Sequence, residues 1–219
     1  MITFLKAEEQ HQHKNGGGWV ANTATVEESA YLGASAQVYG NARVFGNAWV
    51  FDNAQVYGNA WVYGNARVFG NAQVYGDAWV SDNAQVSDNA WVFGNARVSD
   101  NAQVFGNAWV SGNAQVFGSA QVFGNALVSG NARVSGNARV YGNAWVKSPP
   151  YIQGSRHPLT LASFTEIAIG CHVHSIALWK KEYKKIGAIE GYTVSEIKEY
   201  GEYITMLAKA AKRFTKESK

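Results

Sequence analysis

The densest group of chemically reactive side chains lies in the C-terminal third of the chain, in the run Cys-His-Val-His at positions 171–174. Successive side chains on a strand alternate between its faces, so His172 and His174 would share one face while Cys171 packs inward on the other. A protein zinc site usually takes about three or four ligands, and His157 is the only obvious third. We therefore predict no metal site. The candidate interaction residues of this region are His172, His174 and Trp179.

The stretch from residue 19 to residue 146 contains no histidine, cysteine or lysine, so it lacks the usual general bases of an enzyme. Aromatic rings, guanidinium groups and amides recur along it instead. Tryptophan, tyrosine and arginine are enriched at binding hot spots, and their planar groups also stack on sugars or bases. These residue types favour binding over catalysis.

A six-residue pattern positions these side chains. Valine, or once leucine, recurs at every sixth position from Val20 to Val146, and from Ala24 onward an alanine stands two residues before each. A period of six does not match the 3.6 residues of a helical turn, whereas Ala-X-Val is a short strand with its apolar residues on one face. The following Gly-Asn or Asp-Asn pair turns the chain. Identical strands joined by identical corners predict a solenoid.

This pattern resembles the hexapeptide-repeat family of left-handed parallel β-helices over residues 19–146. The resemblance implies three hexads in each triangular coil, and therefore about seven coils around a narrow interior of valine and alanine. Many members of that family are acyltransferases with a catalytic histidine on a coil or an extruded loop. This repeat contains neither feature, so acyltransferase activity is kept only as an alternative.

Folding the repeat on a period of 18 residues aligns its outward side chains in ladders with a spacing of about 4.8 Å. At that spacing arginine can stack on tryptophan and tryptophan on tryptophan. The predicted ligand or interaction face consists of Arg43, Trp61, Trp79, Arg97, Trp91 and Trp109. Aspartates replace four corner glycines, and no calcium site is predicted at Asp52, Asp82, Asp88 and Asp100.

The chain divides into three segments: a flexible lead-in over 1–18, a β-helix of 22 hexads over 19–147 and a C-terminal module over 148–219. The predicted fold class is thus an all-β solenoid, a left-handed parallel β-helix of about seven triangular coils, followed by a small α+β module. His11 and His13 fall in the lead-in, where disorder is expected.

The C-terminal module shows a change of periodicity. Apolar stretches over 159–164 and 167–173 predict a hairpin, and a helix is expected from Ser175 until Gly187 and Gly191 break it. A second helix follows a Thr193–Glu196 capping box. Residues 165–205 resemble the corresponding part of phage- and prophage-encoded hexapeptide-repeat proteins of unassigned function, through Ile-Gly-Cys-His at 169–172 and the later Trp, Gly-Tyr and Tyr positions.

The composition narrows the function. The 219 residues carry a net charge of +3 and a single cysteine, so no disulfide framework forms within the chain and a cytoplasmic protein is expected. No apolar run approaches the ~20 residues of a membrane span, and the mild charge argues against nucleic acid as a partner. We predict a non-catalytic, homo-oligomeric binding or scaffold protein without a cofactor. One alternative, which the phage-like module suggests, is sequestration of a small anionic, nucleotide-like signalling molecule in clefts between subunits.

Overall fold

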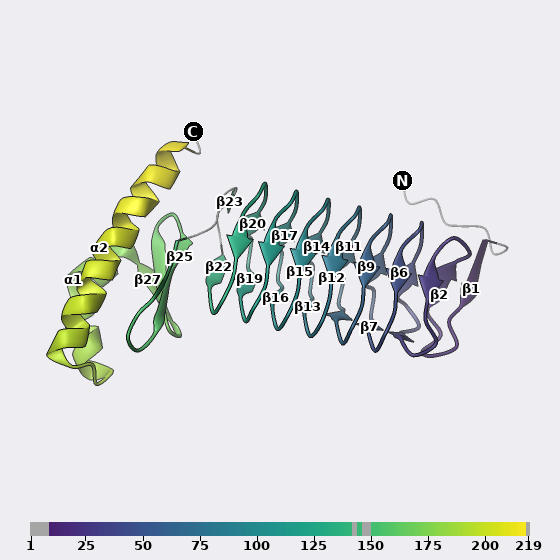
Figure 1. Ribbon diagram of the computed structural model, residues 1–219, viewed down its shortest axis with the longest axis horizontal. Coiled ribbons are helices and arrows are strands. Elements are labelled where there is room, and N and C mark those ends of the chain that lie inside the picture. Colours follow the sequence, from purple (N-terminus) through teal and green to yellow (C-terminus); the bar gives the residue numbers. More distant parts are fainter. Residues whose placement is uncertain (1–8, 142–143, 146–149, 218–219) are drawn as a thin grey trace.

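The computed structural model describes residues 9–141, 144–145 and 150–217. It shows a β-solenoid of about seven turns with a small module of two helices and an antiparallel sheet at its C-terminal end (Figure 1). This architecture confirms the predicted solenoid and the α+β module. No helix among the described residues combines the length and the apolar character that crossing a membrane requires.

Three sheets of two- and three-residue strands form the sides of the solenoid. The first sheet runs in the order β1 (Gln10–Gln12), β2 (Trp19–Ala21), β5 (Gln37–Val38), β8 (Gln55–Val56), β11 (Gln73–Val74), β14 (Trp91–Val92), β17 (Trp109–Val110), β20 (Leu127–Val128) and β23 (Ala144–Trp145). The second comprises β4 (Tyr31–Leu32), β7 (Trp49–Val50), β10 (Arg67–Val68), β13 (Gln85–Val86), β16 (Gln103–Val104), β19 (Gln121–Phe123) and β22 (Arg139–Tyr141). The third comprises β3 (Thr25–Val26), β6 (Arg43–Val44), β9 (Trp61–Val62), β12 (Trp79–Val80), β15 (Arg97–Val98), β18 (Gln115–Val116) and β21 (Arg133–Val134).

Neighbouring strands of the repeat are parallel and pair residues that are 18 positions apart, as between Val68 and Val86. Backbone hydrogen bonds tie each turn to the next, for example from Trp61 N–H to the carbonyl of Ala78 at 2.9 Å. The alanines and valines of the repeat are buried with essentially no exposed surface from Ala30 to Val140. The regular register ends at β20 and β23, where Val128 pairs with Trp145 across 17 positions.

The corners require a left-handed backbone. Gly58 has φ +71°, and a Cβ at this position would lie 3.0 Å from the backbone nitrogen of Gly76 on the next turn. Aspartate occupies the same conformation at four corners, for example Asp52 with φ +56°. Its carboxylate accepts a hydrogen bond of 3.1 Å from the backbone N–H of Gly70. A short polar side chain that bonds locally is what makes this conformation tolerable for a residue other than glycine.

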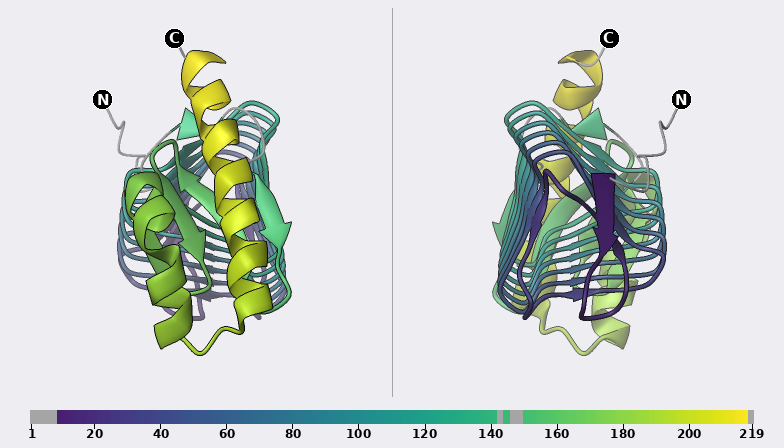
Figure 2. Two further views of the ribbon diagram at one scale, coloured as in Figure 1. Left: turned by 90° about the vertical axis from the view of Figure 1, so that its left-hand side faces the viewer. Right: turned by 90° about the vertical axis from the view of Figure 1, so that its right-hand side faces the viewer.

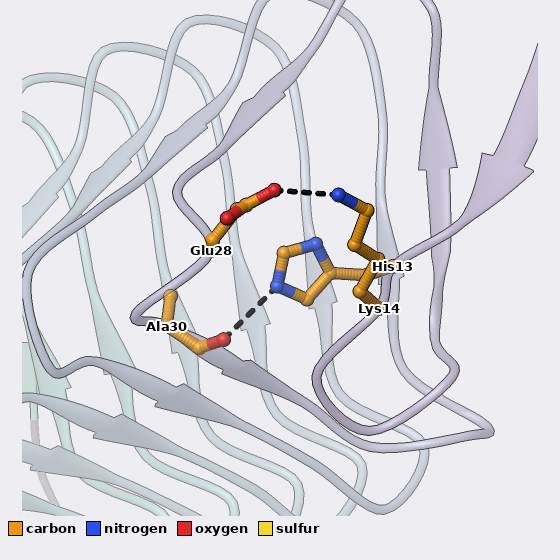
Figure 3. Close-up of polar contacts among 4 residues, drawn as sticks. All are labelled: His13, Lys14, Glu28 and Ala30. Atoms are coloured by element: carbon orange, nitrogen blue, oxygen red, sulfur yellow. Dashed lines mark hydrogen bonds and ion pairs between the residues drawn. The ribbon is translucent and has the colours of Figure 1, made fainter.

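The N-terminal segment is folded from Glu9 onward, which corrects the expected flexible lead-in. β1 pairs antiparallel with β2, and the carbonyl of Asn15 accepts a hydrogen bond from Leu32 N–H. His13 is 7% exposed, and its Nε2 lies 3.0 Å from the carbonyl oxygen of Ala30 (Figure 3). Because a carbonyl only accepts, the ring carries its proton on Nε2. This tertiary anchor covers the first turn and explains why the segment is ordered.

The C-terminal module contains a four-stranded antiparallel sheet of β24 (Tyr151–Gln153), β25 (Pro158–Ser163), β26 (Glu166–Ile169) and β27 (His172–Ser175). The helices α1 (Ile176–Ile189) and α2 (Val194–Glu217) cover the side of the sheet that faces away from the solenoid (Figure 2). The other side meets the last turn, where the Arg139 guanidinium donates to the carbonyl of Cys171 at 3.4 Å. Burial and a hydrogen bond to Glu166 raise the pKa of Tyr141.

One local prediction for the module needs correction, and another is confirmed. Gly187 does not break α1, which continues to Ile189, and only Gly191 with φ +70° lies beyond its end. The missing side chain of Gly187 has a packing role instead, because a Cβ there would lie 2.9 Å from Ile197 Cγ1 of α2. The Thr193–Glu196 capping box is confirmed by reciprocal hydrogen bonds of 2.7 and 3.2 Å.

A charge inside the solenoid should abolish its stability. We expect Val86→Asp to cost several kcal/mol, because Val86 has no exposed surface and its neighbours in the stack are valines. Soluble expression and the thermal unfolding midpoint measure the effect. Gln85→Asp, which adds the same charge to the outer side of the same strand, is the control and should remain folded. A Val86→Asp variant with wild-type thermal stability would contradict the inward assignment.

The buried hydroxyl of Tyr200 joins α2 to the loop before β25. It donates to the carbonyl of His157 at 2.7 Å and accepts from the backbone N–H groups of Arg156 and His157. We expect Tyr200→Phe to destabilise the module by about 1–3 kcal/mol, since these groups lose their partner. Amide hydrogen exchange at Arg156 and His157 should accelerate. Tyr203→Phe, which removes a hydroxyl that bonds the solvent-exposed Glu199, should leave it unchanged. Equal exchange rates in both variants would refute the anchoring role.

Candidate functional site

The third sheet carries the predicted arginine–tryptophan ladder on consecutive strands. The Arg43 guanidinium carbon lies 5.1 Å from the centroid of the Trp61 ring, and that of Arg97 lies 4.8 Å from the Trp79 centroid. The two tryptophan rings stack with centroids 5.5 Å apart and an angle of 14° between their planes. The predicted order Arg43, Trp61, Trp79, Arg97 is therefore present as one continuous stack, which we call the Arg–Trp ladder.

The stack uses the faces of both tryptophan rings. Trp61 lies between Arg43 and Trp79, and Trp79 lies between Trp61 and Arg97. Phe45 adds an edge contact to Trp61 at 5.7 Å. Both tryptophans are consequently partly buried. The Arg–Trp ladder presents ring edges and guanidinium groups to solvent, rather than open ring faces on which a ligand could stack.

The remaining two predicted face residues lie on the first sheet, so the six residues are divided between two sides of the solenoid. Trp91 and Trp109 stack with centroids 5.0 Å apart and nearly parallel planes. Trp109 is 42% exposed, and its neighbour on the next strand is Leu127. The second sheet contributes one more exposed tryptophan, Trp49, at 47%.

Aromatic residues at one corner form a further ladder of Tyr39, Tyr57, Tyr75 and Phe93. Its first two ring pairs are parallel at 4.7 Å, and the Tyr57 hydroxyl donates to the Gln73 side chain at 3.0 Å. Burial, followed by the neighbouring tyrosines, raises the pKa of Tyr57 to about 12. These tyrosines stay neutral near neutral pH and stabilise the corner.

The third sheet also borders a hollow that the sequence analysis missed. The corner column that follows its strands consists of Phe45, Tyr63, Ser81, Ser99, Phe117 and Ser135. Where Ser99 replaces a ring, an open hollow of about 210 Å³ is lined by Arg97, Ser99, Asp100, Gln115, Val116, Phe117 and Arg133. The signal in the sequence was a small residue in a column that carries aromatic rings on other turns.

The candidate histidines of the module do share one face of β27, with ring centroids 6.1 Å apart. His172 Nε2 lies 3.3 Å from the Glu190 carboxylate, and His174 meets the Trp179 ring edge to face at 5.0 Å. Cys171 does not pack inward: it lies exposed in the turn before β27. Within the described part of the chain, no three metal-binding side chains come together.

Trp179 has a structural position rather than an accessible one. It is 3% exposed, and its indole N–H donates to the carbonyl of Ile167 at 2.8 Å. Together with Tyr183 and Tyr192 it lines a largely apolar slot of about 30 Å³ between the helices and the sheet. His172 and Glu190 also line this slot, and their side-chain contact joins the start of β27 to the end of α1 there.

Comparisons with known proteins identify the repeat. The family model described as the YdcK β-solenoid repeat matches eight overlapping or adjacent segments, at residues 36–52, 54–68, 61–76, 72–88, 84–100, 102–118, 120–135 and 132–148. Together these segments cover just over half of the chain. Neither the search of curated proteins nor the search of solved structures found a significant match. The chain therefore belongs to the YdcK β-solenoid repeat family.

Proposed function

We propose that the protein is a non-catalytic scaffold that assembles with copies of itself through the sides of its solenoid, with the Arg–Trp ladder as the principal contact surface. The observation that carries this proposal is the continuous stack of Arg43, Trp61, Trp79 and Arg97 on four consecutive strands. Stacking fixes these large side chains before any partner arrives. Contact therefore costs little side-chain entropy, which is the main advantage of a preorganised surface.

The kind of surface favours a protein partner. Tryptophan and arginine are the residue types that most often dominate binding energy at protein interfaces. Since the ring faces are covered within the stack, the ladder offers edges and charged groups over a straight, flat side. A second flat solenoid side matches that shape better than a small planar molecule does. Trp49 and Trp109 extend the exposed aromatic surface to the other two sides.

A binding role also agrees with the distribution of reactive groups. Histidine, cysteine and lysine are absent from residues 19–146, which leaves the solenoid sides without the bases that acyl transfer usually needs. The histidines of β27 are engaged with Glu190 and Trp179. Acyl transfer and storage of a nucleotide-like signal between subunits remain alternatives without a specific contact in their support. We further propose a cytoplasmic location, because the single Cys171 leaves no disulfide within the chain.

Removing the two central rings of the ladder should disrupt assembly. We expect the double variant Trp61→Ala/Trp79→Ala to weaken self-association at least about tenfold, which corresponds to about 1.4 kcal/mol. The loss of stacking should cost only about 1–3 kcal/mol of folding stability, so circular dichroism should remain that of the wild type. Sedimentation velocity over a concentration series measures the association.

The control is Phe105→Ala/Phe123→Ala, which removes a stacked ring pair with centroids 5.1 Å apart at the corner that follows the second sheet. This variant should lose comparable stability and keep its association. A wild-type protein that sediments as a monomer, or a Trp61→Ala/Trp79→Ala variant with unchanged mass, would disprove assembly through the Arg–Trp ladder.

A further inference from the structure

The hollow beside Ser99 lies where the Arg–Trp ladder stops. On the third sheet the next strand after Arg97 carries Gln115, and the one after that carries Arg133. The guanidinium of Arg97 lies over Trp79 and its side chain also lines the hollow. Arg133 lies over the ring of Phe117 at 5.4 Å and forms the opposite wall. The hollow therefore interrupts a column of planar groups.

The size of the hollow follows from the corner column. Neighbouring rings elsewhere in the solenoid stack at about the turn spacing, as Phe51 and Phe69 do at 4.9 Å. Ser99 supplies no ring to stack on Phe117, so planar space stays open beside it. The volume of about 210 Å³ is below the ~300–1,000 Å³ of sites for drug-sized ligands, so the hollow suits a ligand with a single small ring.

The charges around the hollow select the ligand. Two arginines face one aspartate there, and the Asp100 carboxylate already accepts a hydrogen bond of 2.8 Å from the backbone N–H of Gly118. The local charge therefore favours an anion. Guanidinium groups bind carboxylates through paired hydrogen bonds and also stack on planar rings. The two arginines can therefore bind both the carboxylate and the ring of an aromatic acid.

We propose that this hollow binds a planar aromatic carboxylate, whose ring takes the place beside Phe117 that Ser99 leaves open, between the side chains of Arg97 and Arg133. The ring lies over Gln115 and beside Phe117, and the carboxylate points toward an arginine and away from Asp100. The hollow adjoins the assembly surface and shares Arg97 with the Arg–Trp ladder, but neither Trp61 nor Trp79 lines it. It adds a small-molecule function to the proposed scaffold and does not depend on assembly.

Benzoate is the probe for this site, and isothermal titration calorimetry measures its binding to the full-length protein. We expect one benzoate per chain at millimolar concentrations. Benzamide lacks the charge and cyclohexanecarboxylate lacks the planar ring, so both should bind more weakly. Benzoate that does not bind, or that binds no better than either analogue, would overturn the proposal.

Two variants fill the hollow with residue types that the same columns already carry. Ser99→Phe matches Phe45 and Phe117 in its corner column, and Gln115→Trp matches the tryptophans of its strand column. Each should weaken benzoate binding at least about tenfold while circular dichroism stays unchanged. The matched control is Ser129→Phe, the same substitution at a corner of the first sheet, and it should bind benzoate like the wild type. Wild-type affinity in both Ser99→Phe and Gln115→Trp would place the benzoate elsewhere and refute the site.

Sedimentation of the same samples separates this inference from the proposed assembly. Ser99→Phe should keep the association of the wild type while losing benzoate. If the wild-type protein is a monomer that binds benzoate, only the assembly proposal is refuted. If it assembles but does not bind benzoate, only the proposed ligand site is refuted.

Discussion

The 18-residue register between successive turns is the constraint on which the rest of the structure depends. Backbone hydrogen bonds such as Trp61 N–H to the carbonyl of Ala78 fix this register, and the buried valines keep it in phase. A shift of one residue would turn the valine column outward, and the 18-residue pairing is kept from β2 to β22. Each outward side chain is consequently held one turn, about 4.8 Å, from its counterparts. Ladders of rings, amides and guanidinium groups are a result of this spacing.

The same constraint determines which parts of the surface are chemically available. Within a ladder, planar groups cover one another, as Trp61 and Trp79 do between two arginines. Open planar space arises only where a ladder is interrupted, because the neighbouring rings cannot move closer along the axis. Ser99 and Gln115 make such an interruption beside Arg97. A repetitive surface thus acquires a distinct site by the loss of side chains rather than by the addition of a loop.

The sequence predicted the repeat in detail because each of its interactions is local or exactly periodic in position: strand, corner and ladder all follow from one hexad. It failed where a contact joins unrelated segments. His13 is held by a hydrogen bond to the carbonyl of Ala30, and no sequence pattern near residue 13 predicts this contact. Glycine is typical of helix ends, but Gly187 lies within α1, where its missing side chain makes room for Ile197 of α2. The hollow was missed for another reason: the 18-residue period aligns its wall residues, but the site is marked by a ring that is missing at Ser99 rather than by a residue that is present.

The two ends of the solenoid bear on how copies can meet. Parallel strands at an open end would pair with another molecule, which would lead to indefinite stacking. Here β1 pairs antiparallel with β2, and the carbonyl of Asn15 accepts a hydrogen bond from the N–H of Leu32 at the edge of the second sheet. At the other end the antiparallel sheet meets the last turn, with Arg139 bonded to Cys171 and Tyr141 to Glu166. Because non-repeating segments cover both ends, the solenoid has a defined length, and its sides are the surfaces left for the assembly that we propose.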